Sequence, residues 1–246
     1  SNRGISLTPE GKKLYEHVAI AYEQLQIGEE EIRQNGELEN GLVSIGASEN
    51  ALRLVLLSRL ESFHEQYPHV RLRISNHSTP QAIQALKSDI VDFAAVTTPL
   101  DIKSPLEKIP LASYREILIG GRKYKKLAEH TQKLEDIASL PFISLDENSS
   151  TRELYNSFFL EHGLSFAPDM ETATTDQMLP LITHNLGIGF YPKKMAELAL
   201  TKGDVYQIPL EEKLPLRRIY LVTNGSTAKS TAVRKMIKFI QEYHKI

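Results

Sequence analysis

Hydroxyl and amide side chains gather in this sequence at the points where apolar runs end. The first group, Ser48-Glu49-Asn50, follows the apolar run at residues 41–47 and leads directly into a leucine-rich helical pattern. Four further groups of this kind are Ser78-Thr79, Thr97-Thr98, Asn148-Ser149 and Thr174-Thr175. At the start of a helix, such residues and the outward-pointing backbone N–H groups can bind an anion or a polar metabolite noncovalently. The same residue types also serve as ordinary caps and turn residues without any ligand.

Motifs for covalent or metal-assisted chemistry are absent from the sequence. It contains no Walker loop, no His-Glu-x-x-His zinc motif, no EF-hand loop and no Gly-x-Ser-x-Gly nucleophile elbow. Gly187 and Gly189 have the spacing of a dinucleotide fingerprint, but the third glycine position of that motif is Pro192. The sequence therefore predicts a binding protein rather than an enzyme, with no cofactor and no metal.

Two β-α series must position these polar groups. In the first, a helical stripe at residues 52–67 stops at Pro68, and the alternating residues 70–74 predict a strand at the edge of a sheet. Further strands are predicted at 92–96, 106–111, 115–119, 142–145, 170–173, 186–192, 205–208 and 218–222. Further helices are predicted at 81–87, 152–162, 174–185, 193–201 and 230–243. Gly120-Gly121 is expected to form a flexible joint.

A separate helix is predicted before this α/β body. Thr8-Pro9-Glu10 has the residue types of a helix start. Small or apolar residues then alternate in steps of four and three at Leu14, Val18, Ala21, Leu25, Gly28 and Ile32. This heptad spacing favours a helix that pairs with a second copy. A helix that lies on its own domain is the alternative, and in both cases Gly36 and residues 37–40 end it.

Composition and charge narrow the class of protein. The chain has 246 residues, of which 41% are hydrophobic and 24% charged, as in ordinary globular proteins. A formal charge of −2 gives no basic footprint of a free-standing nucleic-acid binder, and the absence of cysteine excludes disulfides and fits a reducing compartment. No apolar run is long enough to cross a bilayer, and residues 1–5 lack the apolar core of a secretion signal. We expect a cytoplasmic protein without a membrane partner, present here as a fragment whose Ser1-Asn2 is a tag remnant.

Several stretches, taken in order, resemble the LysR-type transcriptional regulators. Leu7-Thr8-Pro9-Glu10-Gly11 before a long helix resembles the family's junction between wing and linker helix, and residues 41–48 resemble its first effector-domain strand. Residues 63–70 are similar to its "F-x-x-x-Y-P-x-V" corner, and residues 90–94 to its "x-x-D-hydrophobic-A" pattern. Residues 185–192 match its "G-x-G-h-x-h-x-P" stretch, with Asn185 where glycine is usual. The order and spacing of these motifs are specific, and the resemblance covers the chain from Leu7 onward.

The resemblance implies an α/β, periplasmic-binding-protein-like fold of two subdomains joined by crossover strands and preceded by a long linker helix. It divides the chain into a dimerisation helix at residues 1–38, a first effector-binding subdomain at 41–119 plus 209–246, and a second at 120–208. The DNA-binding winged helix-turn-helix, which the family places before Leu7, is expected outside this chain.

The family's effector sits in the cleft between the two subdomains. Carried over by position, the expected contacts from the first subdomain are Ser48, Glu49, Asn50, Ser78, Thr79, Thr97 and Thr98. Those from the second are Asn148, Ser149, Thr174, Thr175 and, as an apolar wall, Phe190. Glu49 departs from the Ser or Thr often found nearby in the family, and its carboxylate would repel an anionic effector unless it is paired. The charge of the effector is therefore open at this point.

The resemblance implies a regulator that senses a small-molecule effector. Effector binding would change the geometry of a homodimer or homotetramer, and with it the binding of promoter DNA by the winged helix-turn-helix. The heptad helix would form the dimer, the edge strand 70–74 and the helix before it would join dimers, and RNA polymerase is a further candidate partner. The alternative is a free solute-binding protein that delivers a small molecule to a transporter, for which the first helix has no role. An enzyme ranks third because no motif supports one.

Overall fold

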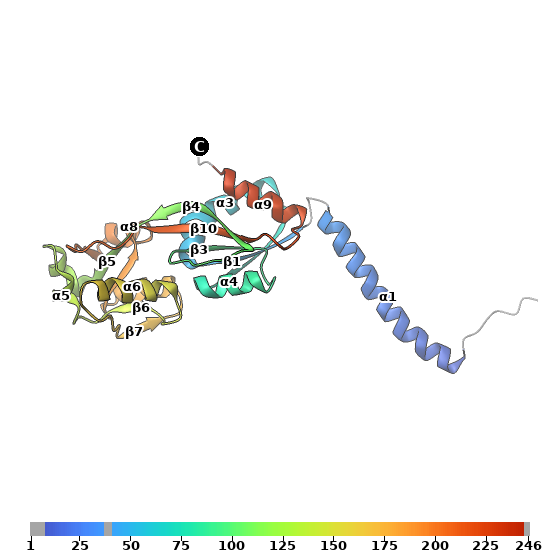
Figure 1. Ribbon diagram of the computed structural model, residues 1–246, viewed down its shortest axis with the longest axis horizontal. Helices are drawn as coiled ribbons and strands as arrows, with labels where there is room; N and C mark the ends of the chain where they lie inside the picture. The colour runs from blue at the N-terminus through green and yellow to red at the C-terminus, as the bar shows by residue number, and fades with distance from the viewer. Residues whose placement is uncertain (1–7, 37–40, 244–246) are drawn as a thin grey trace, which may run out of the picture.

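The computed structural model describes residues 8–36 and 41–243. The predictions for Leu7 and for residues 37–40 lie outside this part. In the described chain a long helix, α1 (Pro9–Gly36), precedes a body of two α/β lobes, as Figure 1 shows. The predicted fold class is confirmed: the lobes are joined by crossover strands and preceded by the long helix.

The first lobe is built on one five-stranded sheet in the order β2-β1-β3-β10-β4. Its strands are β1 (Leu42–Ala47), β2 (Arg71–Asn76), β3 (Phe93–Thr97), β4 (Leu106–Tyr114) and β10 (Arg217–Asn224). Strands β1, β2 and β3 run parallel, while β10 runs antiparallel to β3 and β4. The carboxyl ends of the three parallel strands therefore meet at one edge of the sheet, which is where ligands settle in open α/β sheets.

Helices cover both faces of this sheet. They are α2 (Glu49–Ala51), the π-helix η1 (Leu52–Leu56), α3 (Leu57–Gln66), α4 (Thr79–Lys87) and α9 (Thr231–Glu242). Alternate residues of β3 point to opposite faces: Phe93 packs with the helices η1, α3 and α9, whereas Ala94 packs with α4. Gly41 permits a close approach of α9, because a Cβ there would lie 2.5 Å from Cβ of Ala232.

The second lobe is built on two smaller sheets. One has three antiparallel strands in the order β8-β5-β9, and the other pairs β6 with β7 in parallel. The strands are β5 (Glu116–Gly121), β6 (Ile143–Leu145), β7 (Met170–Thr172), β8 (Ile188–Pro192) and β9 (Val205–Ile208). The helices are the 3-10 helix η2 (Arg122–Ala128), α5 (Leu134–Ile137), α6 (Ser150–Glu161), α7 (Thr175–Thr183) and α8 (Lys193–Lys202). A single bridge between Phe142 and Ile188 links the two sheets.

The predicted edge strand is confirmed. β2 lies at the end of the five-stranded sheet, and Ile74 on its apolar side is 42% exposed. A parallel strand inside the sheet would be covered on both faces, so the alternating pattern of residues 70–74 identified its place correctly.

The predicted joint at Gly120-Gly121 is wrong. Both glycines lie inside β5 and are buried, and a Cβ on Gly120 would lie 2.8 Å from Cβ of Tyr124. Gly120 allows close packing of η2, and Gly121 allows close packing of the end of α7 at Ile182 and Asn185, rather than bending of the chain. The chain instead changes sheets at Arg115, because β4 pairs in the first lobe and β5 pairs only with β8 and β9. The predicted boundary after residue 119 consequently falls inside a strand of the second lobe.

Helix α1 extends away from the body (Figure 1). Its seam residues Leu14, Val18 and Leu25 are 65%, 52% and 67% exposed, and Tyr15 and Tyr22 beside them are also exposed. The side chain of Ile32 lies outside the described part. The helix itself is confirmed, whereas its pairing with a second copy stays a prediction.

Candidate ligand-binding site

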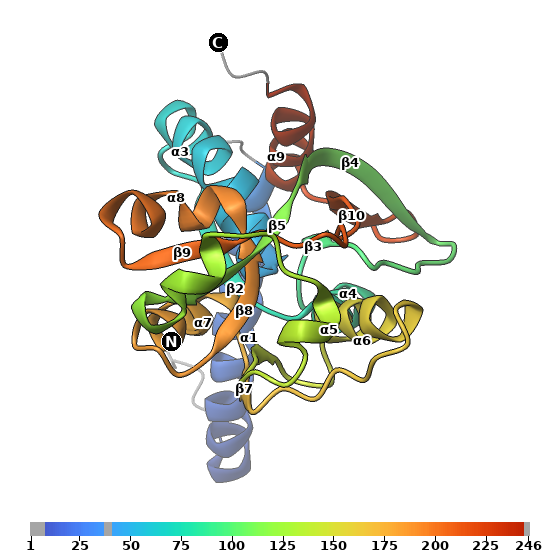
Figure 2. The ribbon, with the colours of Figure 1, turned by 90° about the vertical axis from the view of Figure 1, so that its left-hand side faces the viewer.

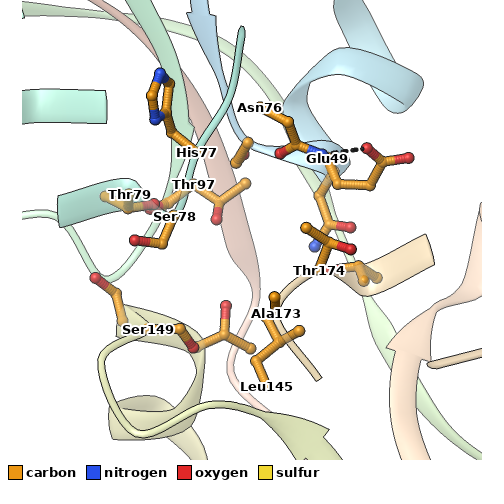
Figure 3. A pocket seen from close by; sticks show the side chains of 15 residues that line it. Glu49, Asn76, His77, Ser78, Thr79, Thr97, Leu145, Ser149, Ala173 and Thr174 are labelled. Atoms are coloured by element: carbon orange, nitrogen blue, oxygen red, sulfur yellow. Dashed lines mark hydrogen bonds between the residues drawn. The ribbon is translucent and has the colours of Figure 1, made fainter. Parts of the chain in front are cut away.

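Four helices from the two lobes begin at one cleft, and Figure 3 shows its lining side chains from close by. In Figure 2 the second lobe faces the viewer, with the first lobe behind it. The residues that cap their N-termini all line it: Ser48 before α2, Ser78 before α4, Ser149 before α6 and Thr174 before α7. The cleft is narrow: the space in it that water-sized groups can occupy is about 30 Å³, well below the usual range of small-molecule sites.

Backbone hydrogen bonds fix the loops that carry these caps. The N–H of Ser48 donates to the carbonyl oxygen of Ala95 (2.9 Å), and the N–H of His77 donates to that of Ala47 (2.9 Å). Across the cleft, the N–H of Asp146 donates to Thr172 (3.0 Å). Each loop therefore continues the pairing of the strand before it, and the helix starts are held rigidly at the edges of the sheets.

The hydroxyls of the capping serines are available as donors. Ser48 Oγ accepts from the N–H of Ala51 (3.3 Å), and Ser149 Oγ accepts from the N–H of Arg152 (3.1 Å). A hydroxyl that accepts in this way still has a proton to donate. Because the first N–H groups of a helix also lack intrahelical acceptors, the cleft is rich in donors and in positive helix-dipole ends. Such an arrangement favours an oxygen-rich anion.

Nine of the twelve predicted site residues line this cleft. They are Ser48, Glu49, Asn50, Ser78, Thr79, Thr97, Ser149, Thr174 and Thr175. The structure thus brings together polar groups that lie up to about half the chain apart in sequence. Their contact with a ligand stays a prediction.

The other three predicted residues do not line the cleft. Phe190 is 2% exposed and packs in the second lobe's core against Phe142 and Tyr155, so it forms no apolar wall. Asn148 is exposed in a turn where its N–H donates to Oδ1 of Asp146 (2.9 Å). Thr98 faces β10, since its Oγ1 accepts from the N–H of Arg218 (3.0 Å).

Six lining residues were not predicted: Asn76, His77, Leu145, Ser150, Thr151 and Ala173. Each lies at or just after the end of a strand, or within the first turn of a helix, so a wider window around the predicted groups includes them. Apolar contacts are few, because only Leu145 and Ala173 contribute apolar side chains to the lining. A compact polar ligand fits this lining better than one with a large apolar body.

Glu49 does not leave an unpaired carboxylate in the cleft. Its Oε2 accepts from Nδ2 of Asn76 (3.0 Å), the dashed line in Figure 3, and its Oε1 lies 3.7 Å from Nη1 of Arg53. Burial raises the pKa of Glu49, and the nearby Asp176 raises it further, while Arg53 and Asn76 act in the opposite direction. The pairing reduces the repulsion of an anion that the sequence suggested.

A buried ion pair lies at the crossover between the lobes. Nη1 of Arg217 is 2.8 Å from Oε1 of Glu116, and the two side chains are 1% and 2% exposed. Burial alone would lower the pKa of Arg217, but Glu116 together with the neighbouring tyrosines outweighs it, and the pKa is raised. Tyr155 donates to Oε2 of Glu116 (3.0 Å), and burial raises the pKa of Tyr155. The guanidinium and the carboxylate are therefore held as a charged, hydrogen-bonded pair.

Sequence reasoning missed this pair. Residue 217 lies just outside the predicted strand 218–222, and residue 116 lies within the predicted strand 115–119. A charged residue in an apolar strand is a signal of a buried pair, but the partner cannot be identified without the fold.

Among the described residues, no group of three or more His, Asp or Glu side chains is arranged to hold a metal ion. No helix in the described ranges is both long enough and apolar enough to cross a membrane.

Two α/β lobes with crossover strands and a polar cleft between them define a periplasmic-binding-protein-like ligand-binding domain. The model of the LysR substrate binding domain matches residues 36–245. The chain belongs to this family.

Known proteins with similar sequences and structures agree with this assignment. The chain is 23% identical to the HTH-type transcriptional regulator CzcR of Bacillus subtilis over 241 residues, which cover 98% of this chain and 80% of CzcR. The effector binding domain of QuiR in complex with shikimate superposes with a TM-score of 0.72 at 20% identity, covering 83% of this chain and 97% of QuiR's. The CcmR regulatory domain of Synechocystis PCC6803 in complex with 2-PG gives a TM-score of 0.73 at 15% identity, covering 82% and 96%.

Proposed function

We propose that the chain is the effector-sensing part of a LysR-type transcriptional regulator and that its effector is a small, oxygen-rich anion. The observation that carries this proposal is the meeting of four helix N-termini, two from each lobe, at one cleft. Helix dipoles and N–H groups stabilise negative charge there. Because both lobes contribute, a bound anion would favour one spacing of the lobes over others.

The anion class is favoured over a cation by the state of the carboxylates. Glu49 is the acidic residue of the cleft lining, and it is already engaged by Asn76 and Arg53. A cationic ligand would have to compete with Arg53 for this carboxylate and would face the positive ends of four helices. The paired state of Glu49 and the four helix starts therefore support an anion as the effector, whose charge the sequence left open.

The regulatory role is supported by the relatives. Effector domains of this fold are known with small molecules, shikimate in QuiR and 2-PG in CcmR. CzcR, which the chain matches over 98% of its length, carries the name of a transcriptional regulator. A free solute-binding protein would share the lobes but would give no role to α1.

We infer that the working protein binds promoter DNA as a dimer or tetramer through a winged helix-turn-helix attached before Leu7. The exposed seam of α1, with Leu14, Val18 and Leu25, would pair two copies. The edge strand β2 and helix α3, with exposed Ile74 and Leu57, would join dimers. RNA polymerase would then respond to the rearranged assembly.

A thermal-shift screen tests the ligand class. The panel contains carboxylates and phosphate esters on one side and amines and amino alcohols on the other, each at equal ionic strength. We expect at least one anion to raise the melting temperature of the wild type and to raise that of Ser48→Ala less at the same concentration. The matched control is Thr98→Ala, a hydroxyl removed just outside the cleft, which should respond as the wild type does. Stabilisation by amines alone would overturn the proposal.

A further inference from the structure

Arg217 makes contacts that a simple stabilising ion pair does not need. Besides its bond to Glu116, its Nη2 donates to Oγ1 of Thr97 (3.0 Å) and to Oγ1 of Thr151 (2.9 Å). Its Nε donates to the carbonyl oxygen of Thr98 (2.9 Å), and its Nη2 also contacts that oxygen. Thr97 ends β3 of the first lobe and Thr98 follows it, whereas Thr151 lies in the first turn of α6 of the second lobe. One guanidinium therefore joins the two lobes.

The two threonines are part of the cleft, while Arg217 is not. Thr97 and Thr151 both line the cleft, and Arg217 lies beneath them, 1% exposed. A ligand in the cleft can touch the hydroxyls but has no access to the guanidinium. Any effect of Arg217 on binding must consequently act through these hydroxyls or through the spacing of the lobes.

The chemistry of the guanidinium decides how the Thr151 hydroxyl is oriented. A guanidinium only donates, so Oγ1 of Thr151 must accept from it and keeps its proton for another partner. The residue lines the cleft, so the proton can be given to an acceptor bound there. In a protein without Arg217, the Thr151 hydroxyl would be free either to accept or to donate a hydrogen bond.

A second set of contacts anchors the network in both lobes. Oε2 of Glu116 accepts from Tyr155 in α6, and Nδ2 of Asn50 donates to the hydroxyl of Tyr114 (3.3 Å). The ring of Tyr114 lies 5.5 Å from the guanidinium carbon of Arg217. Asn50 itself lines the cleft. Lining residues of the cleft therefore connect to Arg217 by two routes: directly through Thr97 and Thr151, and through Asn50 and Tyr114.

We propose that Arg217 is a positioning residue for the cleft: it ties the hydroxyls of Thr97 and Thr151 together, fixes the spacing of the lobes and presents the Thr151 hydroxyl as a donor to the bound anion. The donor part of this inference rests on the proposed anion-binding function; the spacing part does not. Glu116 keeps the guanidinium in place by holding its other edge.

The first test measures lobe spacing without any ligand. The chain has no cysteine, so Lys87→Cys on α4 and Leu160→Cys on α6 allow two spin labels, one on each lobe. The pair is then removed as Arg217→Met with Glu116→Leu, since replacing both partners of a buried pair by apolar residues often preserves stability. We expect a broader distance distribution than in the wild type. The control, Arg122→Met with Asp204→Leu, removes an exposed pair of the second lobe (3.2 Å) and should leave the distribution unchanged.

The second test measures binding of inorganic sulfate, an acceptor-only anion. Thr151→Val is expected to weaken sulfate binding about tenfold, the effect of one hydrogen bond to a charged group, and Thr151→Ser should restore it. Removing Arg217 and Glu116 should weaken binding to a similar extent. Combining that change with Thr151→Val should add little, because both act through one hydroxyl. If the pair had a purely structural role, the losses of sulfate affinity caused by the two changes would instead multiply when the changes are combined.

These outcomes separate the inference from the proposed function. An unchanged distance distribution, or multiplying losses of affinity, would overturn the positioning role. If wild-type protein bound no sulfate at the cleft, this would count against the anion class, and the label distances alone would then decide whether Arg217 holds the lobes. Should the double replacement fail to fold, Thr151→Val with both labels tests the same contact.

Discussion

The first lobe carries its two cleft helices on one continuous sheet, whereas the second carries its pair on a sheet broken into three strands and two. Their cores differ too. The first is packed largely with aliphatic side chains around Ile45 and Leu221, and the second contains a cluster of aromatic rings around Phe142 and Phe190. Despite these differences, each lobe offers two helix starts capped by Ser or Thr. The two lobes share the edge that faces the cleft and differ in the sheets and core behind it.

The largest expected effect is a loss of stability that is confined mainly to the core of the second lobe. Phe190→Ala should lower the free energy of unfolding by about 4 kcal/mol, because it removes a ring packed against Phe142, Tyr155 and Phe158. Hydrogen exchange should show the loss of protection mainly in the second lobe. Since Phe190 is no cleft wall, sulfate affinity of the folded fraction should stay unchanged. Equal loss of protection in both lobes would show that they form one cooperative unit.

The next effect concerns the link between the lobes. Glu116→Gln leaves the buried guanidinium of Arg217 without a counter-charge and should cost about 3 kcal/mol in urea unfolding. The control is Glu171→Gln, which breaks the more exposed pair with Arg152 (2.7 Å) and should cost less than about 1 kcal/mol. If both variants lost the same stability, the buried pair would have no special part in joining the lobes.

A smaller effect compares the two cleft edges directly. Ser48→Ala in the first lobe and Ser149→Ala in the second should each cost about 1 kcal/mol of stability through loss of a helix cap. Each should also weaken sulfate binding several-fold. Ser230→Ala removes the cap of α9, far from the cleft lining, where Ser230 accepts from Val233 (3.3 Å). It should cost the same stability without any change in sulfate affinity. A loss of sulfate affinity in Ser230→Ala would contradict the proposal that the helix starts at the cleft bind the anion.

The smallest expected effect is a pH dependence of sulfate affinity that arises from Glu49 in the first lobe and not from Glu161 in the second. The raised pKa of Glu49 means that its ionised form is disfavoured in the folded state, so this group lowers stability above its folded pKa and has no effect below its ordinary value of 4.5. Sulfate keeps its charge over this range, and its affinity should therefore fall as the pH rises through the pKa of Glu49. Glu49→Gln should remove this dependence and bind slightly more tightly at neutral pH. Glu161→Gln, at the end of α6, should retain the wild-type profile.

The sequence predicted the first lobe's edge more accurately than the second's, and the comparison explains why. In parallel strands the carboxyl ends share one edge, so Ser48, Ser78 and Thr97 could be placed together from strand positions alone. Thr98, which follows the end of β3, does not line the cleft because its hydroxyl faces β10. The loop before α6 turns Asn148 outward, a detail of turn geometry that residue types do not determine.

The contacts between lobes were beyond prediction for another reason. Arg217 and Glu116 are 101 residues apart, and their pairing depends on how two lobes come together rather than on any local pattern. The prediction for Gly120 and Gly121 was wrong for a related reason. Glycine occurs both at flexible joints and where segments pack closely, and only the neighbours in the fold, Tyr124 at Gly120 and Ile182 at Gly121, distinguish the two cases.

The central claim is that both lobes bind one anion at the same edge, and an amide-resolved titration with inorganic sulfate tests it most directly. We predict that the N–H signals at the starts of α2, α4, α6 and α7 shift together and fit a single dissociation constant. The signals of α1 and of the start of α9 should stay in place. If only one lobe responded, or if the two lobes titrated with different constants, the account of a shared anion site between them would be contradicted.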